Sequence, residues 1–182
     1  MNIKLMPVLT FLGLSILLSG CLFPASQSAI NYYDLDTPQT APSPEVRIII
    51  EGFENLAGCS DKMRYRIDRN RQVFDEQNKW VQSPEEMLSR YLSASLTGNT
   101  SGKSYRLRGK LEVFEIDLHN ETVSMQCSFT IFQDGSDLKL SQTYRKTIEL
   151  KKKSPQEFAE AFSATAAGLA EEIKKISLNS IK

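Results

Sequence analysis

Residues 83–96 read SPEEMLSRYLSASL and carry three signals for the start of a helix. Serine is a favoured N-cap, proline is favoured at the first helical position, and a glutamate three residues after the serine completes a capping box. Leucines and a tyrosine then recur at helical spacing, and Gly98 ends the pattern. These signals predict one helix that buries a single face.

The same opening returns at Ser154-Pro155-Gln156-Glu157. An apolar stripe at helical spacing follows it, which predicts a second helix of about twenty residues. The members of this stripe are Phe158, Phe162, Thr165, Ala166, Leu169, Ile173 and Ile176. A stripe of this length needs a sheet to cover, or else a partner surface.

Three strand patterns precede the first helix. A β-branched run at residues 46–53 has apolar residues of both parities, which fits a central strand covered on both sides. Met63, Tyr65 and Ile67 alternate with polar residues, and Val73-Phe74 follows a turn. This arrangement predicts a hairpin whose arginines point away from its apolar face.

Three more strand patterns lie between the two helices. They span residues 105–118, 123–131 and 138–150, and short turns at residues 119–121 and 134–136 join them as an antiparallel meander. The apolar parity of the first pattern shifts near Val113-Phe114, which predicts a bulge there.

The order of these elements is βββα-βββα. We predict an α+β fold in which a mainly antiparallel sheet carries two helices packed on one face. Residues 46–182 are then a single domain, a length that suits one ordinary core. Convergent capping chemistry explains the two Ser-Pro openings as well as an internal duplication does.

The N-terminal segment predicts the cellular address. Lys4 is followed by an apolar stretch and then by Leu18-Ser19-Gly20-Cys21, which has the layout of a secretory signal. A transmembrane anchor is the alternative, but it needs about twenty apolar residues, and this run is shorter and interrupted by Pro7. Leu-Ser-Gly-Cys resembles the bacterial lipobox, in which the cysteine thiol is diacylated before cleavage. We therefore expect residues 1–20 to be removed and Cys21 to carry the lipid.

Residues 21–45 are rich in proline, serine and threonine, which predicts a flexible linker. Within it, Asn31-Tyr32-Tyr33-Asp34-Leu35 is an apolar island that is able to dock on the domain as an extended segment. Leu22 stands where an aspartate would resemble the inner-membrane retention signal. This favours the outer membrane, with the protein on its periplasmic face.

The charge balance and the motifs restrict the classes of function that we expect for this protein. Without Lys4 the mature chain has 21 basic and 22 acidic residues, so no global field attracts nucleic acid. His119 is the only histidine, and no phosphate-binding or hydrolase motif is present. We therefore predict no catalytic residue, no metal site and no cofactor, and hence a protein that is not an enzyme.

Cys59 and Cys127 remain after Cys21 is lipidated. The periplasm permits a disulfide between them, whereas a buried free thiol at Cys127 is the equal alternative. Neither cysteine lies in a CxxC motif, so redox catalysis is not indicated.

Three surface or packing features have two interpretations each. The run Lys151-Lys152-Lys153 suits either anionic headgroups or, more simply, a solvated strand-to-helix junction. The arginines from residue 64 to residue 71 lie among acids, which favours surface pairing or a protein contact over nucleic acid. Trp80, the only tryptophan, suits core packing at the helix entrance or an interface anchor.

Several short motifs together resemble the ABC-type transport auxiliary lipoproteins, the PqiC-like family. They are the lipobox, Tyr32-Tyr33-Asp34-Leu35, Met63-Arg64-Tyr65-Arg66, and Trp80 leading into Ser83-Pro84-Glu85-Glu86. The family often has Trp-Ala-Glu-Pro after the strand, where this chain has Trp80-Val81-Gln82-Ser83-Pro84.

The resemblance implies a non-enzymatic, lipid-anchored partner of an MCE-domain lipid transport system at the outer membrane. Docking would use the sheet edge or the hairpin, with Tyr65, Arg66 and Trp80 as candidate contacts and several copies forming a homo-oligomer. A free-standing carrier that holds a lipid or lipoprotein acyl chain in its own cavity is the alternative.

Overall fold

The computed structural model describes residues 29–39, 45–98, 103–135, 137 and 139–179. The predicted signal peptide, the predicted lipidation site Cys21 and most of the predicted linker lie outside the described residues.

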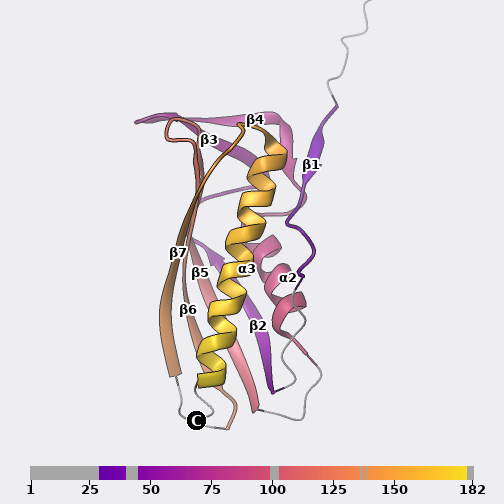
Figure 1. Ribbon diagram of the computed structural model, residues 1–182, viewed down its shortest axis with the longest axis vertical. Helices are drawn as coiled ribbons and strands as arrows, with labels where there is room; N and C mark the ends of the chain where they lie inside the picture. The colour runs from indigo at the N-terminus through magenta and orange to yellow at the C-terminus, as the bar shows by residue number, and fades with distance from the viewer. Residues whose placement is uncertain (1–28, 40–44, 99–102, 136, 138, 180–182) are drawn as a thin grey trace, which may run out of the picture.

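Within the described residues, seven strands form one sheet, and two helices pack on it (Figure 1). The strands are β1 (Asn31–Tyr33), β2 (Val46–Asn55), β3 (Lys62–Asp68), β4 (Arg71–Trp80), β5 (Lys103–Asp117), β6 (Thr122–Gln133) and β7 (Lys139–Glu149). The helices are α2 (Pro84–Leu96) and α3 (Pro155–Asn179). The α+β class is confirmed. The sheet is mixed, because β1 runs parallel to β4, and both β2 and β3 run parallel to β5.

β5 organises the sheet because each of its edges pairs along most of its length. One edge pairs with β6, which in turn pairs with β7, and this is the predicted meander. The predicted bulge is present, since the β5–β6 register shifts between Leu111 and Val113. The other edge of β5 pairs first with β2 and then, at Ile116 and Asp117, with β3. The β3–β4 hairpin therefore lies at one end of the sheet, beyond β2.

The prediction that residues 46–53 form a central strand is wrong. β2 pairs with β5 alone among the described strands. Its register shifts between Ile50 and Gly52, so Ile48 and Phe53 point to the same face despite their different parity. A bulge, and not burial on both sides, explains the apolar residues at both parities.

Both helices begin at the predicted serines. The Glu86 carboxylate accepts a hydrogen bond from the Ser83 N–H at 3.3 Å, as a capping box requires. The Ser154 Oγ accepts one from the Glu157 N–H, also at 3.3 Å. α3 is 25 residues long, somewhat longer than predicted.

The core lies between the two helices and one face of the sheet. Alternate residues of β5 and β6 point into it, and so does the predicted stripe of α3, with Ile176 at its partly buried end. Phe114 of β5 stacks on Phe162 of α3, with ring centroids 3.6 Å apart. Each large side chain buried in this way contributes about 1.5–3 kcal/mol, so the stripe fixes α3 on the sheet.

The folded unit begins earlier than the predicted boundary at residue 46. β1 pairs with the end of β4, and Leu35 packs against the core. The Asp36 N–H donates to the Ser163 Oγ at 2.8 Å, and Asp34 forms an ion pair with Arg90 of α2. The apolar island of the predicted linker therefore docks as an extended segment across the helices.

Candidate functional site

The β3–β4 hairpin separates an apolar face from a charged one. Met63 and Tyr65 point toward the helices, and the intervening Arg64 and Arg66 point outward, as the alternation predicted. Directly opposite residues on antiparallel strands share a face, so Phe74, the partner of Arg64, also points outward.

Arg66 is held in place by Glu115 of β5. Its Nε donates to Glu115 Oε1 at 2.8 Å, and its Nη2 contacts the same oxygen. Its Nη1 donates to the carbonyl of Arg69 in the hairpin turn at 3.1 Å. The hydrogen bond and charge of Glu115 raise the pKa of Arg66, so the guanidinium stays protonated. About a quarter of each side chain remains exposed, 28 % for Arg66 and 24 % for Glu115.

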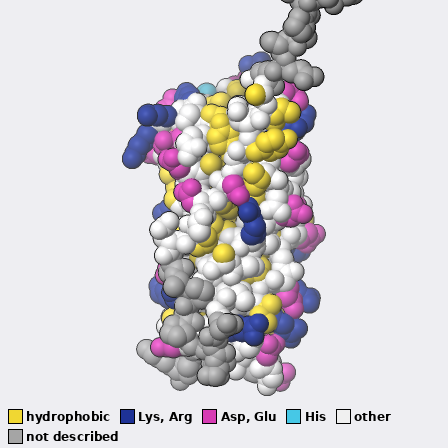
Figure 2. Space-filling view, turned by 90° about the vertical axis from the view of Figure 1, so that its right-hand side faces the viewer, with side chains coloured by type: hydrophobic (Ala, Val, Ile, Leu, Met, Phe, Trp, Pro, Cys, Tyr) yellow, Lys and Arg dark blue, Asp and Glu magenta, His cyan; other side chains and the backbone are white. Residues whose placement is uncertain are grey.

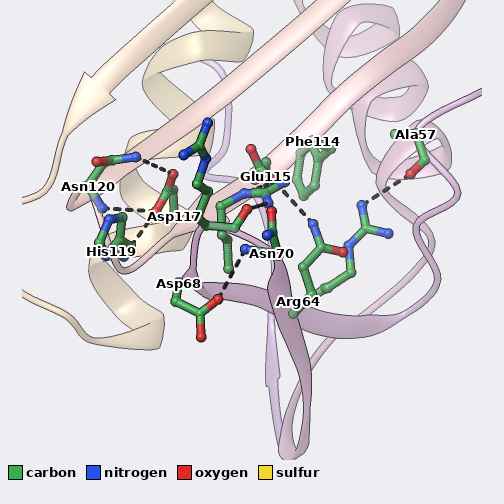
Figure 3. A network of polar contacts seen from close by, with 12 residues as sticks. Ala57, Arg64, Asp68, Asn70, Phe114, Glu115, Asp117, His119 and Asn120 are labelled. Atoms are coloured by element: carbon green, nitrogen blue, oxygen red, sulfur yellow. Dashed lines mark hydrogen bonds and ion pairs between the residues drawn. The ribbon is translucent and has the colours of Figure 1, made fainter.

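Neighbouring turns extend this polar network (Figure 3). The Arg64 Nη2 donates to the carbonyl of Ala57 at 3.1 Å. The Asp117 carboxylate accepts from the backbone N–H groups of His119 and Asn120, each at 2.9 Å. Burial opposes ionisation of Asp117, but these hydrogen bonds outweigh it and lower its pKa. The Leu118 N–H also donates to the Arg66 carbonyl at 2.8 Å, which joins the hairpin to the β5–β6 turn.

Tyr65 is half-buried and is fully engaged within the hairpin. Its hydroxyl donates to Asp75 Oδ2 at 2.7 Å, and its ring lies 5.6 Å from that of Phe158. Burial and the hydrogen bond to Asp75 raise the pKa of Tyr65. Tyr65 therefore supports the hairpin from below, whereas Arg66 is the member of the pair that reaches the surface.

Trp80 lies in the core, so the prediction that it contacts a partner is wrong. Its side chain is only 2 % exposed. Its ring meets those of Phe114 and Phe162 edge-on, at centroid distances of 5.6 and 5.7 Å. This is the packing alternative that the sequence left open for the tryptophan.

The large hydrophobic side chains that are exposed in the described structure gather at the hairpin end. They are Ile30, Tyr32, Leu56, Val73, Phe74 and Val81. Phe74 is 54 % exposed beside the outward arginines. We define the hairpin surface as Arg64, Arg66 and Phe74, which share the outward face of the hairpin. An exposed aromatic next to arginines is the composition of a protein-binding surface.

Residues 60–174 match one protein family, described as the ABC-type transport auxiliary lipoprotein component. The match covers more than half of the 182 residues and includes the hairpin, α2, the meander and α3 as far as residue 174. The chain belongs to this family. The family resemblance drawn from the sequence is thereby confirmed. Its description is that of a transport component and not of an enzyme, and a lipoprotein family implies association with a membrane.

Two solved structures share the fold of this auxiliary lipoprotein. One is an uncharacterized protein with a TM-score of 0.61, 16 % identical, covering 85 % of this chain and 99 % of its own. The other is protein XCC0632 from Xanthomonas campestris, with a TM-score of 0.60 and 13 % identity, covering 80 % of this chain and 92 % of its own. No match was found among curated proteins.

Cys59 and Cys127 of the auxiliary lipoprotein are both free thiols in the structure, not a disulfide. β5 lies between them. Across one edge of β5, Leu111 pairs with Cys127. Across the other edge, the Leu111 carbonyl accepts hydrogen bonds from the N–H groups of Leu56 and Ala57, which lie near Cys59 in the sequence. Burial raises the pKa of the Cys127 thiol to about 12, which makes it unreactive.

The described residues contain no cluster of three or more histidine, cysteine or acidic side chains that could hold a metal ion. Within the same residues, no helix is both long and apolar enough to cross a membrane.

Sequence reasoning missed Phe74 as a surface residue, although a signal was present. Successive residues of a strand point to opposite faces, so Val73 and Phe74 cannot both face the core. The predicted hairpin placed these two residues after a turn but assigned neither of them to a face.

Proposed function

We propose that this auxiliary lipoprotein is anchored by a lipid on Cys21 to the periplasmic face of the outer membrane and docks a periplasmic MCE-domain assembly there. The system it serves would be a phospholipid transporter of the ABC type or a related one. The single observation that carries the docking proposal is the hairpin surface, where Phe74 is exposed beside Arg64 and Arg66.

Two properties of the hairpin surface support docking. It is rigid, because Glu115 and the Ala57 carbonyl hold the two arginines, so little side-chain freedom is lost on binding. It also combines an aromatic ring with guanidinium groups, and residues of these types dominate binding energy at interfaces.

Serine in place of Phe74 is expected to weaken recovery of the MCE-domain protein by at least about tenfold, because a central aromatic contact is lost. Since Phe74 is more than half exposed, the fold should be retained. The measurement is co-purification of the MCE-domain protein with the affinity-tagged lipoprotein from detergent-solubilised membranes. Arg66→Glu should also weaken recovery, but part of its effect will be a loss of stability next to Glu115.

Lys175→Glu is the matched control for Arg66→Glu, since Lys175 is an exposed cation on α3 and its replacement reverses the same charge. It should leave recovery unchanged. If Phe74→Ser and Arg66→Glu are both folded and both recover as much MCE-domain protein as the wild type, the hairpin surface is excluded as the docking site.

We further propose that several copies assemble into a homo-oligomer. The support is the outer edge of β7, an eleven-residue strand that pairs only with β6 within the described sheet. Unpaired strand edges are templates for pairing with another chain.

The alternative function, a free-standing carrier of acyl chains, has less support. One hollow on the helix-free face of the sheet is lined by three cations, Arg108, Lys110 and Lys139, by several hydroxyl side chains, and by Phe129 and Phe132 as its aromatic residues. Acyl chains require an apolar lining, so this hollow does not suit them.

A further inference from the structure

We propose that the outward face of the β1–β4 pair lies against the bilayer that holds the anchor. This tether face consists of Ile30, Tyr32, Lys79 and Val81. The inference rests on the proposed lipidation of Cys21 and goes beyond it, because it assigns a second, direct contact between the domain and the lipid.

The register of the two strands defines the tether face. Tyr33 lies opposite Trp80, whose ring is buried in the core, so the adjacent residues point the other way. Tyr32 lies opposite Lys79, and the Val81 N–H donates to the Tyr33 carbonyl at 3.0 Å. Tyr32 is 59 % exposed, and Ile30 and Val81 are nearly as open at 47 % and 42 %.

The chain length between anchor and domain places this face near the membrane. Ile30 lies nine positions after Cys21 in the sequence. A fully extended chain spans at most about 3.3–3.6 Å per residue, so the tether face can stand no farther than about 30 Å from the lipidated cysteine. The pairing of β1 with β4 sets this upper limit, because a linker that was free as far as residue 45 would reach much farther. Such tethering gives the face a high local concentration at the lipid surface.

The side chains of the tether face suit a lipid surface. Tyrosine is enriched at membrane interfaces, where its ring is apolar and its hydroxyl is wet. Isoleucine and valine can enter the acyl boundary, while a lysine directs its ammonium group to phosphates. Lys79 has no ion pair among the described contacts, and the residue opposite it on β3, Lys62, is a second cation that pairs with Glu76 at 2.9 Å.

The surrounding end of the molecule agrees with this orientation. Hydrophobic side chains gather on the upper part of the surface in Figure 2. The connection from β7 to α3 lies at the same end of the molecule (Figure 1), and its Lys151 and Lys152 are exposed. The basic run that the sequence left with two interpretations is thereby placed where headgroups would lie.

The tether face is distinct from the hairpin surface, although β4 contributes to both. Asp75 separates them by a bulge, in which its Oδ1 accepts from the N–H groups of Gln77 and Asn78 at 2.8 and 2.9 Å. Phe74 lies before this bulge and Lys79 after it. One strand can therefore meet a protein with one half and lipid with the other.

A photo-crosslinking experiment tests the proposal. The lipidated protein carries benzoylphenylalanine in place of Tyr32 and is reconstituted into vesicles of phosphatidylethanolamine and phosphatidylglycerol. The matched control has the same group in place of Gln142, an exposed residue of β7. Mass spectrometry counts phospholipid adducts. We expect at least about tenfold more adduct at position 32 than at position 142, because tethering concentrates lipid at the former.

Two further measurements separate the outcomes. The double variant Ile30→Ser and Val81→Ser should reduce the amount of phospholipid adduct at position 32 severalfold. It should not unfold the protein, since both residues are exposed. Equal adducts at positions 32 and 142 on a protein whose mass includes the acyl chains would overturn this inference alone. So would adducts at position 32 that join a second copy of the chain. A mass without acyl chains would overturn the anchor and the inference together.

Discussion

Replacement of Trp80 by alanine is expected to lower the free energy of unfolding by about 3–5 kcal/mol. The indole fills the space where the end of β4, β5 and α3 meet, and its ring is in edge contact with Phe114 and Phe162. Its removal would leave a cavity that these two rings, already stacked on each other, cannot fill without breaking that stack. The loss would be a large part of the stability of a typical domain.

Urea unfolding followed by far-ultraviolet circular dichroism measures this loss, because the variant has no tryptophan left for fluorescence. Phe74→Ala is the matched control, since it truncates an exposed aromatic on the same strand and should change stability by no more than about 0.5 kcal/mol. A loss below about 1 kcal/mol for Trp80→Ala would show that the ring is not part of the core.

Cys21→Ser, with residues 1–20 replaced by a secretory signal that is cleaved without lipidation, is expected to move the protein almost completely from the membrane to the soluble periplasmic fraction. The lipobox reaction forms a thioether, which a serine hydroxyl cannot provide. Two or three acyl chains anchor through about 0.8 kcal/mol per buried CH₂, and the variant would lose all of that binding. Direct contact through the tether face alone would be too weak to hold the domain.

Fractionation after a carbonate wash, with labelled palmitate, measures this effect. Cys59→Ser is the matched control, because it makes the same change at a thiol that is not in a lipobox. A Cys21→Ser protein that is still labelled and still present in washed membranes would contradict lipidation at Cys21.

Much of the fold could be predicted because local chemistry determines it. The Ser83 and Ser154 caps place both helix starts, and the alternation along β6 places the meander. Even the bulge near Val113 was visible, because the apolar parity of the strand changes there. Each of these features depends on residues that are close together in the sequence.

Strand direction and strand neighbours could not be predicted in the same way. The sequence of residues 46–55 does not indicate that β2 pairs in parallel with β5, since side chains alternate in the same way in parallel and antiparallel strands. The bulge at Glu51 made an edge strand look like a central one. β1 was visible only as an apolar island, because its short pairing with β4 depends on residues almost fifty positions away.

The candidate site was partly predictable. The outward arginines followed from alternation, and Arg66 was identified before its partner Glu115 could be. Trp80 was given an interface role among its alternatives because sequence does not distinguish a buried anchor from an exposed one. Phe74 was missed because its exposure depends on which face of the hairpin the helices cover.

Site-specific crosslinking in living cells tests the docking proposal most directly. Benzoylphenylalanine replaces Phe74 in the full-length lipoprotein, and Gln142 is again the control position. We predict a covalent adduct between position 74 and the MCE-domain protein, and none from position 142. A folded, membrane-bound protein that gives no such adduct at position 74, or equal adducts at both positions, would contradict the docking proposal.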